Sequence, residues 1–182
     1  NRSKDILKSE VLGHYSGEET KCKCCGVKEM GILTIDHLND NGAEHRREIF
    51  GENHKKGGYN FYRWLKKNNY PADFQVLCYN CQFRKLRALE RSNRKTHLQE
   101  VRAAYVRSIK LECLDHYGGR QCGCGESDIE VLTLDHVNDD GAEHRREKGV
   151  FGFNFYMMLR KSEFPDNVPL QTLCFNCQIR KR

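Results

Sequence analysis

The stretch LTIDHLNDNGAEHRRE at Leu33–Glu48 recurs almost unchanged as LTLDHVNDDGAEHRRE at Leu132–Glu147. Further matches follow in the same order along the chain: VLGHYSG with CLDHYGG, NFYRWL with NFYMML, and LCYNCQFRK with LCFNCQIRK. A match of this length and order indicates a tandem duplication. We expect a first unit over 1–88, a connector over 89–105 and a second unit over 106–182.

Each repeat is small, and a core built by fewer than about 90 residues is only marginally stable without a metal or another staple. The 182 residues are 38% hydrophobic and include 10 cysteines. No run of 18 apolar residues and no secretory-signal pattern is present, so we expect no membrane span and a cytoplasmic or other intracellular protein that is not secreted. In such a compartment cysteines serve more often as metal ligands than as disulfides.

The cysteine spacing of the first repeat predicts a zinc site. Cys22-x-x-Cys25-Gly and Cys78-x-x-Cys81 have the two-knuckle spacing of a tetrahedral site with four thiolates. Cys24 is an alternative partner for Cys22, although the glycine after Cys25 favours the CxxCG interpretation.

The second repeat predicts a matching zinc site with one departure. Cys174-x-x-Cys177 keeps the usual spacing, but its partner pair is Cys122-x-Cys124, which is one residue shorter. Cys113 aligns with the apolar Val11 and is interpreted as a buried free cysteine. We therefore expect two structural zinc ions per chain.

The remaining patterns predict one order of elements in each repeat. A leading helix (5–15; 106–117) precedes the first cysteine pair, and a strand (32–35; 131–134) then ends at Asp-His. The next segment, with NDNG or NDDG and more glycines, is expected to be a loop that includes His45 and His144. A short amphipathic helix (61–67; 155–161), a second strand (FQVLC; LQTLC) and a closing helix follow it. The predicted fold class is α+β.

The Asp-His pairs, enclosed between two cysteine pairs, resemble the HNH or His-Me finger (ββα-metal) endonucleases, and most closely their zinc-stapled branch that includes recombination endonuclease VII. The resemblance covers most of both repeats. It implies two tandem zinc-stabilised ββα-metal units, a strand-end Asp that binds Mg²⁺ or Mn²⁺, and a following His that acts as general base. It also implies a metal ligand directly after the last zinc cysteine, where this chain has Gln instead of the family's Asn or His. The residues concerned are Asp36, His37 and Gln82 in the first repeat and Asp135, His136 and Gln178 in the second.

A further histidine in each repeat, with the Arg-Arg-Glu that follows it, is a candidate contact to the scissile phosphate. The alternative is a solvated, internally paired surface. These residues are His45, Arg46 and Arg47 in the first repeat and His144, Arg145 and Arg146 in the second. Asn60 and Asn154 are interpreted as helix N-caps rather than metal ligands, and the Phe-Tyr residues after them as a packing face.

The segment from Arg84 to Lys110 carries a net charge of +7. The whole chain carries +6, so all other residues together carry −1. It contains neither Gly nor Pro, so we expect it to form a long basic helix that joins the units. Nucleic acid across this helix would meet both repeats, whereas the alternative is an ordinary solvated helix face. The candidate DNA contacts here are Arg91, Arg94, Lys95 and Arg102.

Together these patterns predict a metal-dependent endonuclease of the homing or phage type that acts on double-stranded DNA. A single chain would act as a pseudo-dimer, with one site for each strand. The alternative is a catalytically inactive zinc protein that binds nucleic acid, RNA included, or has a structural role.

Overall fold

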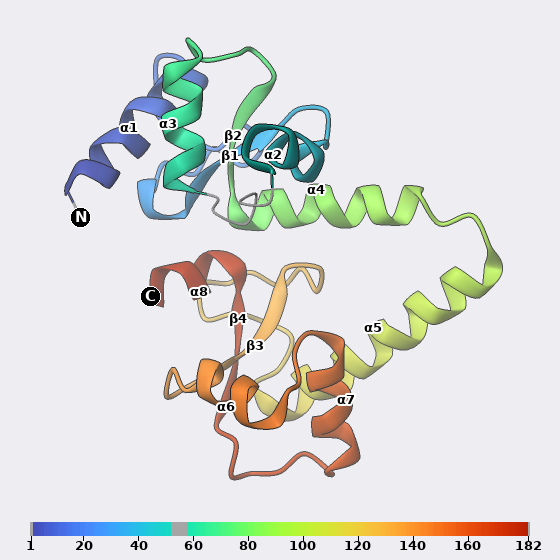
Figure 1. Cartoon of the computed structure of the whole chain (residues 1–182). Helices are drawn as coiled ribbons and strands as arrows, with labels where there is room; N and C mark the ends of the chain where they lie inside the picture. Colours follow the sequence, from blue (N-terminus) through green and yellow to red (C-terminus); the bar gives the residue numbers. More distant parts are fainter. Residues whose placement is uncertain (1, 52–57, 182) are drawn as a thin grey trace. The chain divides into compact units, whose positions relative to one another are not determined.

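The computed structural model describes residues 2–51 and 58–181 of the chain. Its fold class is α+β, as predicted, with helices around two small antiparallel sheets. The chain divides into two compact units, Asn1–Gln82 and Phe83–Arg182, and each has its own two-stranded sheet (Figure 1). Within the described ranges no helix is long and apolar enough to cross a membrane.

The first unit places its helices around the β1–β2 sheet, and α3 packs against α1 (Figure 1). Its two strands pair antiparallel with Leu33 opposite Cys78 and Asp36 opposite Gln75. The elements are α1 (Arg2–Ser16), η1 (Met30–Ile32), β1 (Leu33–His37), α2 (Gly42–Phe50), α3 (Tyr59–Lys67), β2 (Phe74–Cys78) and the first residues of α4 (Tyr79–Ser92), whose remainder belongs to the second unit.

The second unit repeats this order around its own sheet, with Asp135 opposite Gln171. Its elements are α5 (His97–Tyr117), β3 (Leu132–His136), α6 (Gly141–Lys148), α7 (Phe153–Lys161), β4 (Leu170–Cys174) and α8 (Phe175–Lys181). Small contacts recur as well: Tyr15 Oη donates to the carbonyl of Pro71 at 2.9 Å, and Tyr117 Oη donates to that of Pro165 at 3.3 Å.

The apolar residues that the strands and helices turn inward form a small core in each unit. Val11, Leu12 and Leu65 are fully buried in the first unit, and Ile109, Leu114 and Leu159 in the second. The predicted packing face is confirmed, because Phe61 and Tyr62 are buried and Phe61 stacks on His37 with ring centroids 5.4 Å apart. Asp-His thus ends a strand that lies against the core.

The prediction of a loop after Asp-His holds for residues 38–41 and 137–140 but is wrong beyond them, because helices α2 and α6 begin at Gly42 and Gly141. Asn and Gly in this segment suggested a turn, but Ala-Glu-His-Arg-Arg-Glu consists mainly of residues that favour helix. In each unit one residue of the short turn before the helix adopts the left-handed region: Asp40 with φ 58° and Asp139 with φ 61°. His45 and His144 therefore lie on helices.

The prediction of one long connector helix is also wrong, because the chain forms two helices, α4 and α5, with a break between Ser92 and His97. Thr96 ends the break with a capping box: its side chain accepts from the Gln99 amide, and the Gln99 side chain accepts from the Thr96 amide. The second helix, α5, contains the predicted leading helix of the second repeat.

The interpretation of Asn60 and Asn154 as N-caps is wrong as well. Gly58 and Gly152 occupy the N-cap positions, and each Asn is the second residue of its helix. Both glycines have positive φ, 65° and 57°. This backbone conformation explains why glycine, and not the side-chain cap that sequence favours, stands there.

Candidate functional site

Four cysteines of each unit meet at one point, as the spacing predicted. Cys22, Cys25, Cys78 and Cys81 have Sγ atoms within 4.8 Å of one another, and so do Cys122, Cys124, Cys174 and Cys177. The Cys25–Cys78 and Cys124–Cys174 Sγ pairs are each 3.7 Å apart. Four thiolates about 2.3 Å from a tetrahedral zinc would be separated by about 3.8 Å. Both clusters could therefore hold zinc.

The shorter knuckle of the second unit closes with a turn that is one residue tighter than that of the first. The Gly26 amide donates to the Cys22 carbonyl at 2.9 Å, and the Gly125 amide donates to that of Cys122 at 2.8 Å. Both glycines have positive φ, 75° and 90°, which a residue with a side chain adopts only with strain. Cys24 lies outside the cluster and is exposed, whereas Cys113 is a buried free cysteine on α5.

The thiol groups of each cluster differ in acidity. Burial raises the pKa of Cys22, but hydrogen bonds from the backbone N–H groups of Cys25 and Cys78 outweigh burial and bring it to about 7. Cys122 reaches about 7 through its bonds to Cys124 and Cys174. Burial and the neighbouring thiols raise the pKa of Cys81 and of Cys177 far above that of a free cysteine. Only a cation among the four sulfurs would ionise all of them near neutral pH.

The Asp-His pair of the first unit lies at the end of β1, beside the closing strand and helix. Asp36 and His37 are both buried. Gln75, directly opposite on β2, donates from Nε2 to Asp36 Oδ2 at 2.9 Å, and Gln82 on α4 donates to Oδ1 at 3.4 Å. The structure thus brings Gln82 next to Asp36.

The glutamine that recurs at Gln75 and Gln171 was not among the site residues predicted from the sequence. Gln171 donates to Asp135 Oδ2 at 3.3 Å, as Gln75 does to Asp36. The signal was the Gln that FQVLC and LQTLC share. Its meaning depends on strand register, because each Gln faces its Asp only across the hairpin.

A second histidine contacts the strand-end histidine in both units. His37 Nε2 lies 2.9 Å from His45 Nδ1, and His136 Nε2 lies 2.8 Å from His144 Nδ1. Burial lowers the pKa of His136. A His with a lowered pKa is neutral at physiological pH and can accept a proton.

The glycine that opens α2 or α6 makes room for this imidazole. A Cβ on Gly42 would lie 2.9 Å from His37 Nδ1, and one on Gly141 would lie 2.8 Å from His136 Nδ1. The rings have little freedom to move, because both are buried and stack on Phe61 or Phe155. Close approach therefore explains the recurring glycine.

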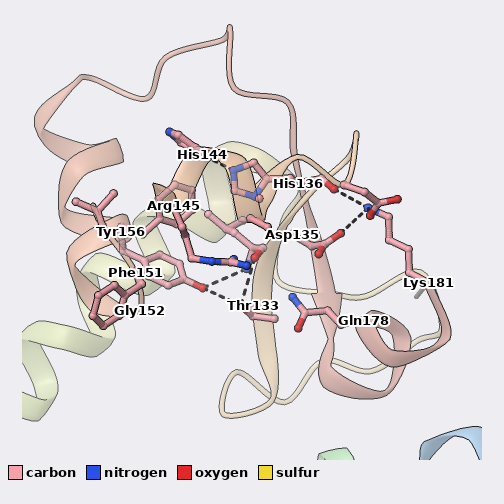
Figure 2. A pocket seen from close by; sticks show the side chains of 16 residues that line it. Thr133, Asp135, His136, His144, Arg145, Phe151, Gly152, Tyr156, Gln178 and Lys181 are labelled. Carbon is pink, nitrogen blue, oxygen red and sulfur yellow. Dashed lines mark hydrogen bonds and ion pairs between the residues drawn. The ribbon is translucent and has the colours of Figure 1, made fainter. Parts of the chain in front are cut away.

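A cleft of about 790 Å³ exposes these groups in the second unit. Figure 2 shows Asp135, His136 and His144 around it, with Gln178 and Lys181 reaching in from α8. Tyr156 forms part of the wall, where its Oη accepts from the Leu134 amide at 3.1 Å. Lys181, which the sequence analysis did not select, contacts Asp135 Oδ2 at 2.7 Å.

The Arg pairs of α2 and α6 are exposed. Arg145 lines the cleft, whereas Arg47 and Arg146 each donate from Nε to a carbonyl of their own helix, at 3.3 and 3.4 Å. Arg46 is on the solvent-facing surface of α2. Of these side chains, the structure brings Arg145 to the Asp-His pair.

The basic segment is partly neutralised by acidic residues. Arg84 pairs with Glu126 and Asp128, and Arg91 with Glu130 at 3.3 Å. Burial, together with nearby Arg87 and Arg107, lowers the pKa of Lys110 to about 8. Arg94, Lys95 and Arg102 are exposed, and the described part of the chain offers them no ion pair.

Comparisons of the chain with protein-family models, curated proteins and solved structures found no match. The assignment of function therefore depends on the residues and their geometry.

Proposed function

We propose that this chain is a metal-dependent DNA endonuclease that hydrolyses phosphodiester bonds, with one HNH-like site in each repeat. The observation that carries the proposal is the second-unit cleft, where a buried His of lowered pKa lies next to a carboxylate. His136 can accept a proton, Asp135 can hold a cation, and Arg145 can face a phosphate. The first unit has the same Asp-His and His-His arrangement.

The proposed fold of each unit is a zinc-stabilised ββα-metal unit. In support, each hairpin is followed at once by a helix, α4 or α8, and the last cysteine pair spans that junction. One structural zinc ion per cluster would tie the first knuckle to the second strand and the helix. The fold and the site would then depend on the same staple.

The histidine pair suggests how a proton moves. If His136 Nε2–H donates to His144 Nδ1, the lone pair of His136 stays on Nδ1, and that atom takes a proton from the attacking water. The resulting hydroxide would form a bond to phosphorus while the P–O3′ bond breaks, and the 3′ oxygen would take up a proton from solvent. The nonpolar stack of Phe155 against the ring keeps His136 in place.

The residues present fit a hard divalent cation, because carboxylate and carboxamide oxygens are the donors that Mg²⁺ and Mn²⁺ prefer. Asp36 with Gln82, and Asp135 with Gln178, would hold it. When bound, such a cation supplies positive charge that stabilises the leaving oxygen.

The proposed partner is double-stranded DNA, held by phosphate contacts from exposed cations. Arg145 would act at the cleft, with Arg46, Arg47 and Arg146 around the two sites, and Arg94, Lys95 and Arg102 along the connector. A monomer with two sites would address one strand with each, in the manner of a homodimer.

One observation favours the alternative of an inactive zinc protein that binds nucleic acid. Lys181 satisfies Asp135 without any divalent cation, which a non-catalytic module could retain. Plasmid cleavage by zinc-loaded protein with Mg²⁺ or Mn²⁺ decides between the two. The nuclease proposal expects cleavage by wild type and none by His37→Ala/His136→Ala, whereas the alternative expects DNA binding without cleavage by either.

A further inference from the structure

One turn of the second unit surrounds the Lys181 ammonium with oxygen atoms. Lys181 Nζ lies 2.7 Å from Asp135 Oδ2, 2.8 Å from Asp139 Oδ1, 2.5 Å from the His136 carbonyl and 3.2 Å from that of Val137. Figure 2 shows the side chain reaching from α8 to this turn. The four atoms, two carboxylate and two carbonyl oxygens, are called the oxygen cage below.

The oxygen cage has the composition of a site for a hard cation. It contains only oxygen donors, and its two carboxylates exceed the single charge of the lysine by one. An ammonium has three N–H donors, so it cannot serve all four oxygens fully at once. The turn also holds Asp139 in the left-handed region, φ 61°, with its amide donating to the His136 carbonyl at 3.2 Å. The same turn thus supplies both the His136 carbonyl and the Asp139 carboxylate to the cage.

We propose that Lys181 is a built-in cation of the second unit, which occupies the oxygen cage until the divalent cation displaces it. This inference rests on the proposed function, since it concerns the cation that Asp135 would hold. The same Asp135 oxygen cannot contact the ammonium and a divalent cation at full strength together. Occupancy by Lys181 therefore weakens divalent-cation binding. The apparent association constant is the intrinsic constant multiplied by the fraction of molecules in which Lys181 does not fill the cage.

Lys181 is well placed to leave. It lies at the end of α8, its side chain is 22% exposed, and its flexible stem can extend into solvent. Displacement replaces the contact of Asp135 with Lys181 by its contact with the divalent cation that Asp135 and Gln178 would hold, so it demands no rearrangement of β3 or β4. The second centre is then stable without the divalent cation and still able to bind it.

Titration of zinc-loaded full-length protein with Mn²⁺, with free Mn²⁺ followed by electron paramagnetic resonance, tests this inference. Asp36→Ala is present throughout, to silence the first centre. Adding Lys181→Met should tighten Mn²⁺ binding roughly tenfold, because the competing ion is removed. The matched control is Lys161→Met, which removes the same charge from the exposed end of α7 and should change the affinity less than twofold.

The unmodified lysine gives a second readout that does not depend on how the variant folds. In ¹⁵N–¹H spectra of lysine ammonium groups, Mg²⁺ should move the Lys181 signal to the position of solvated lysines. Equal Mn²⁺ affinity in the Lys181 and Lys161 variants, or a Lys181 signal that Mg²⁺ leaves unchanged while the cation binds, overturns the inference but not the proposed function. Absence of Mn²⁺ binding in all these variants overturns the cation site itself, and the inference with it.

Discussion

His136 and His144 share a hydrogen bond of 2.8 Å between Nε2 and Nδ1, and His37 and His45 repeat it at 2.9 Å. One ring donates and the other accepts in this bond, so the bond couples the tautomers of the two rings. A residue eight positions away, on a different element, thereby orients the proposed base. The second histidine is best interpreted as a positioning residue.

This relationship predicts different effects from two substitutions of His144. In an Asp36→Ala background, His144→Phe keeps a ring but removes the acceptor, so cleavage by the second centre should fall about 10–100-fold. His144→Asn places an amide oxygen near the position of Nδ1 and should retain most activity. Single-turnover nicking rates measure both. Equal loss in the two variants would contradict a positioning role.

The close approach of Gly42 to His37 predicts that a single methyl group disturbs the site. Gly42→Ala places Cβ 2.9 Å from Nδ1 of a buried ring, and the strain should destabilise the zinc-loaded protein by about 1–3 kcal/mol. Gly31→Ala is the matched control, since no atom lies within 4 Å of its Cβ position. Denaturant unfolding compares the two, and equal stability would show that the ring adjusts freely.

Zinc removal should unfold both units, and zinc affinity should rise with pH. Binding needs thiolates, and Cys22 and Cys122, with pKa values of about 7, ionise first, whereas Cys81 and Cys177 hold their protons until the metal displaces them. Zinc binding at pH 7 should therefore release protons. Elemental analysis should find two zinc ions per chain. A result of one or none would contradict one or both of the proposed zinc sites. Calorimetry in buffers of different ionisation enthalpy measures the protons.

The unpaired cations of the connector should carry the salt dependence of DNA binding. Arg102→Gln should lower the slope of log affinity against log salt by about 0.9, and Arg94→Gln/Lys95→Gln/Arg102→Gln by about 2.7, on any DNA sequence. Arg87→Gln, whose cation already pairs with Glu90 at 2.6 Å, should change the slope less. An unchanged slope in the triple variant would place the DNA elsewhere.

Local patterns were enough to predict the strands, the closing helices and both cysteine clusters. Cysteine spacing and period-two strands depend on neighbours in sequence, so the repeat needed no tertiary information. The leading helix of the second unit was predicted over 106–117, whereas α5 begins at His97. Its start is marked by the capping box of Thr96 and Gln99, which the prediction of one long basic helix overlooked.

The missed parts depend on contacts between distant residues. Gln75 meets Asp36 only through strand register, and Lys181 meets Asp135 only because α8 returns to the β3 turn. The prediction of a loop around His45 was wrong because Asn and Gly favour a turn, while the residues after Gly42 form helix α2. Sequence alone showed that these residues recur but not what they contact.

The most direct test of the central claim is strand-resolved cleavage of a duplex by zinc-loaded protein with Mg²⁺ or Mn²⁺. If each repeat contains one working site, wild type cuts both strands, Asp36→Ala and Asp135→Ala each leave a nick, and the double variant does neither. Losing a cation ligand should cost several kcal/mol of stabilisation at the leaving oxygen. If one Asp variant cuts both strands as well as wild type, the corresponding repeat only binds; if wild type cuts neither strand, the chain is not the proposed nuclease.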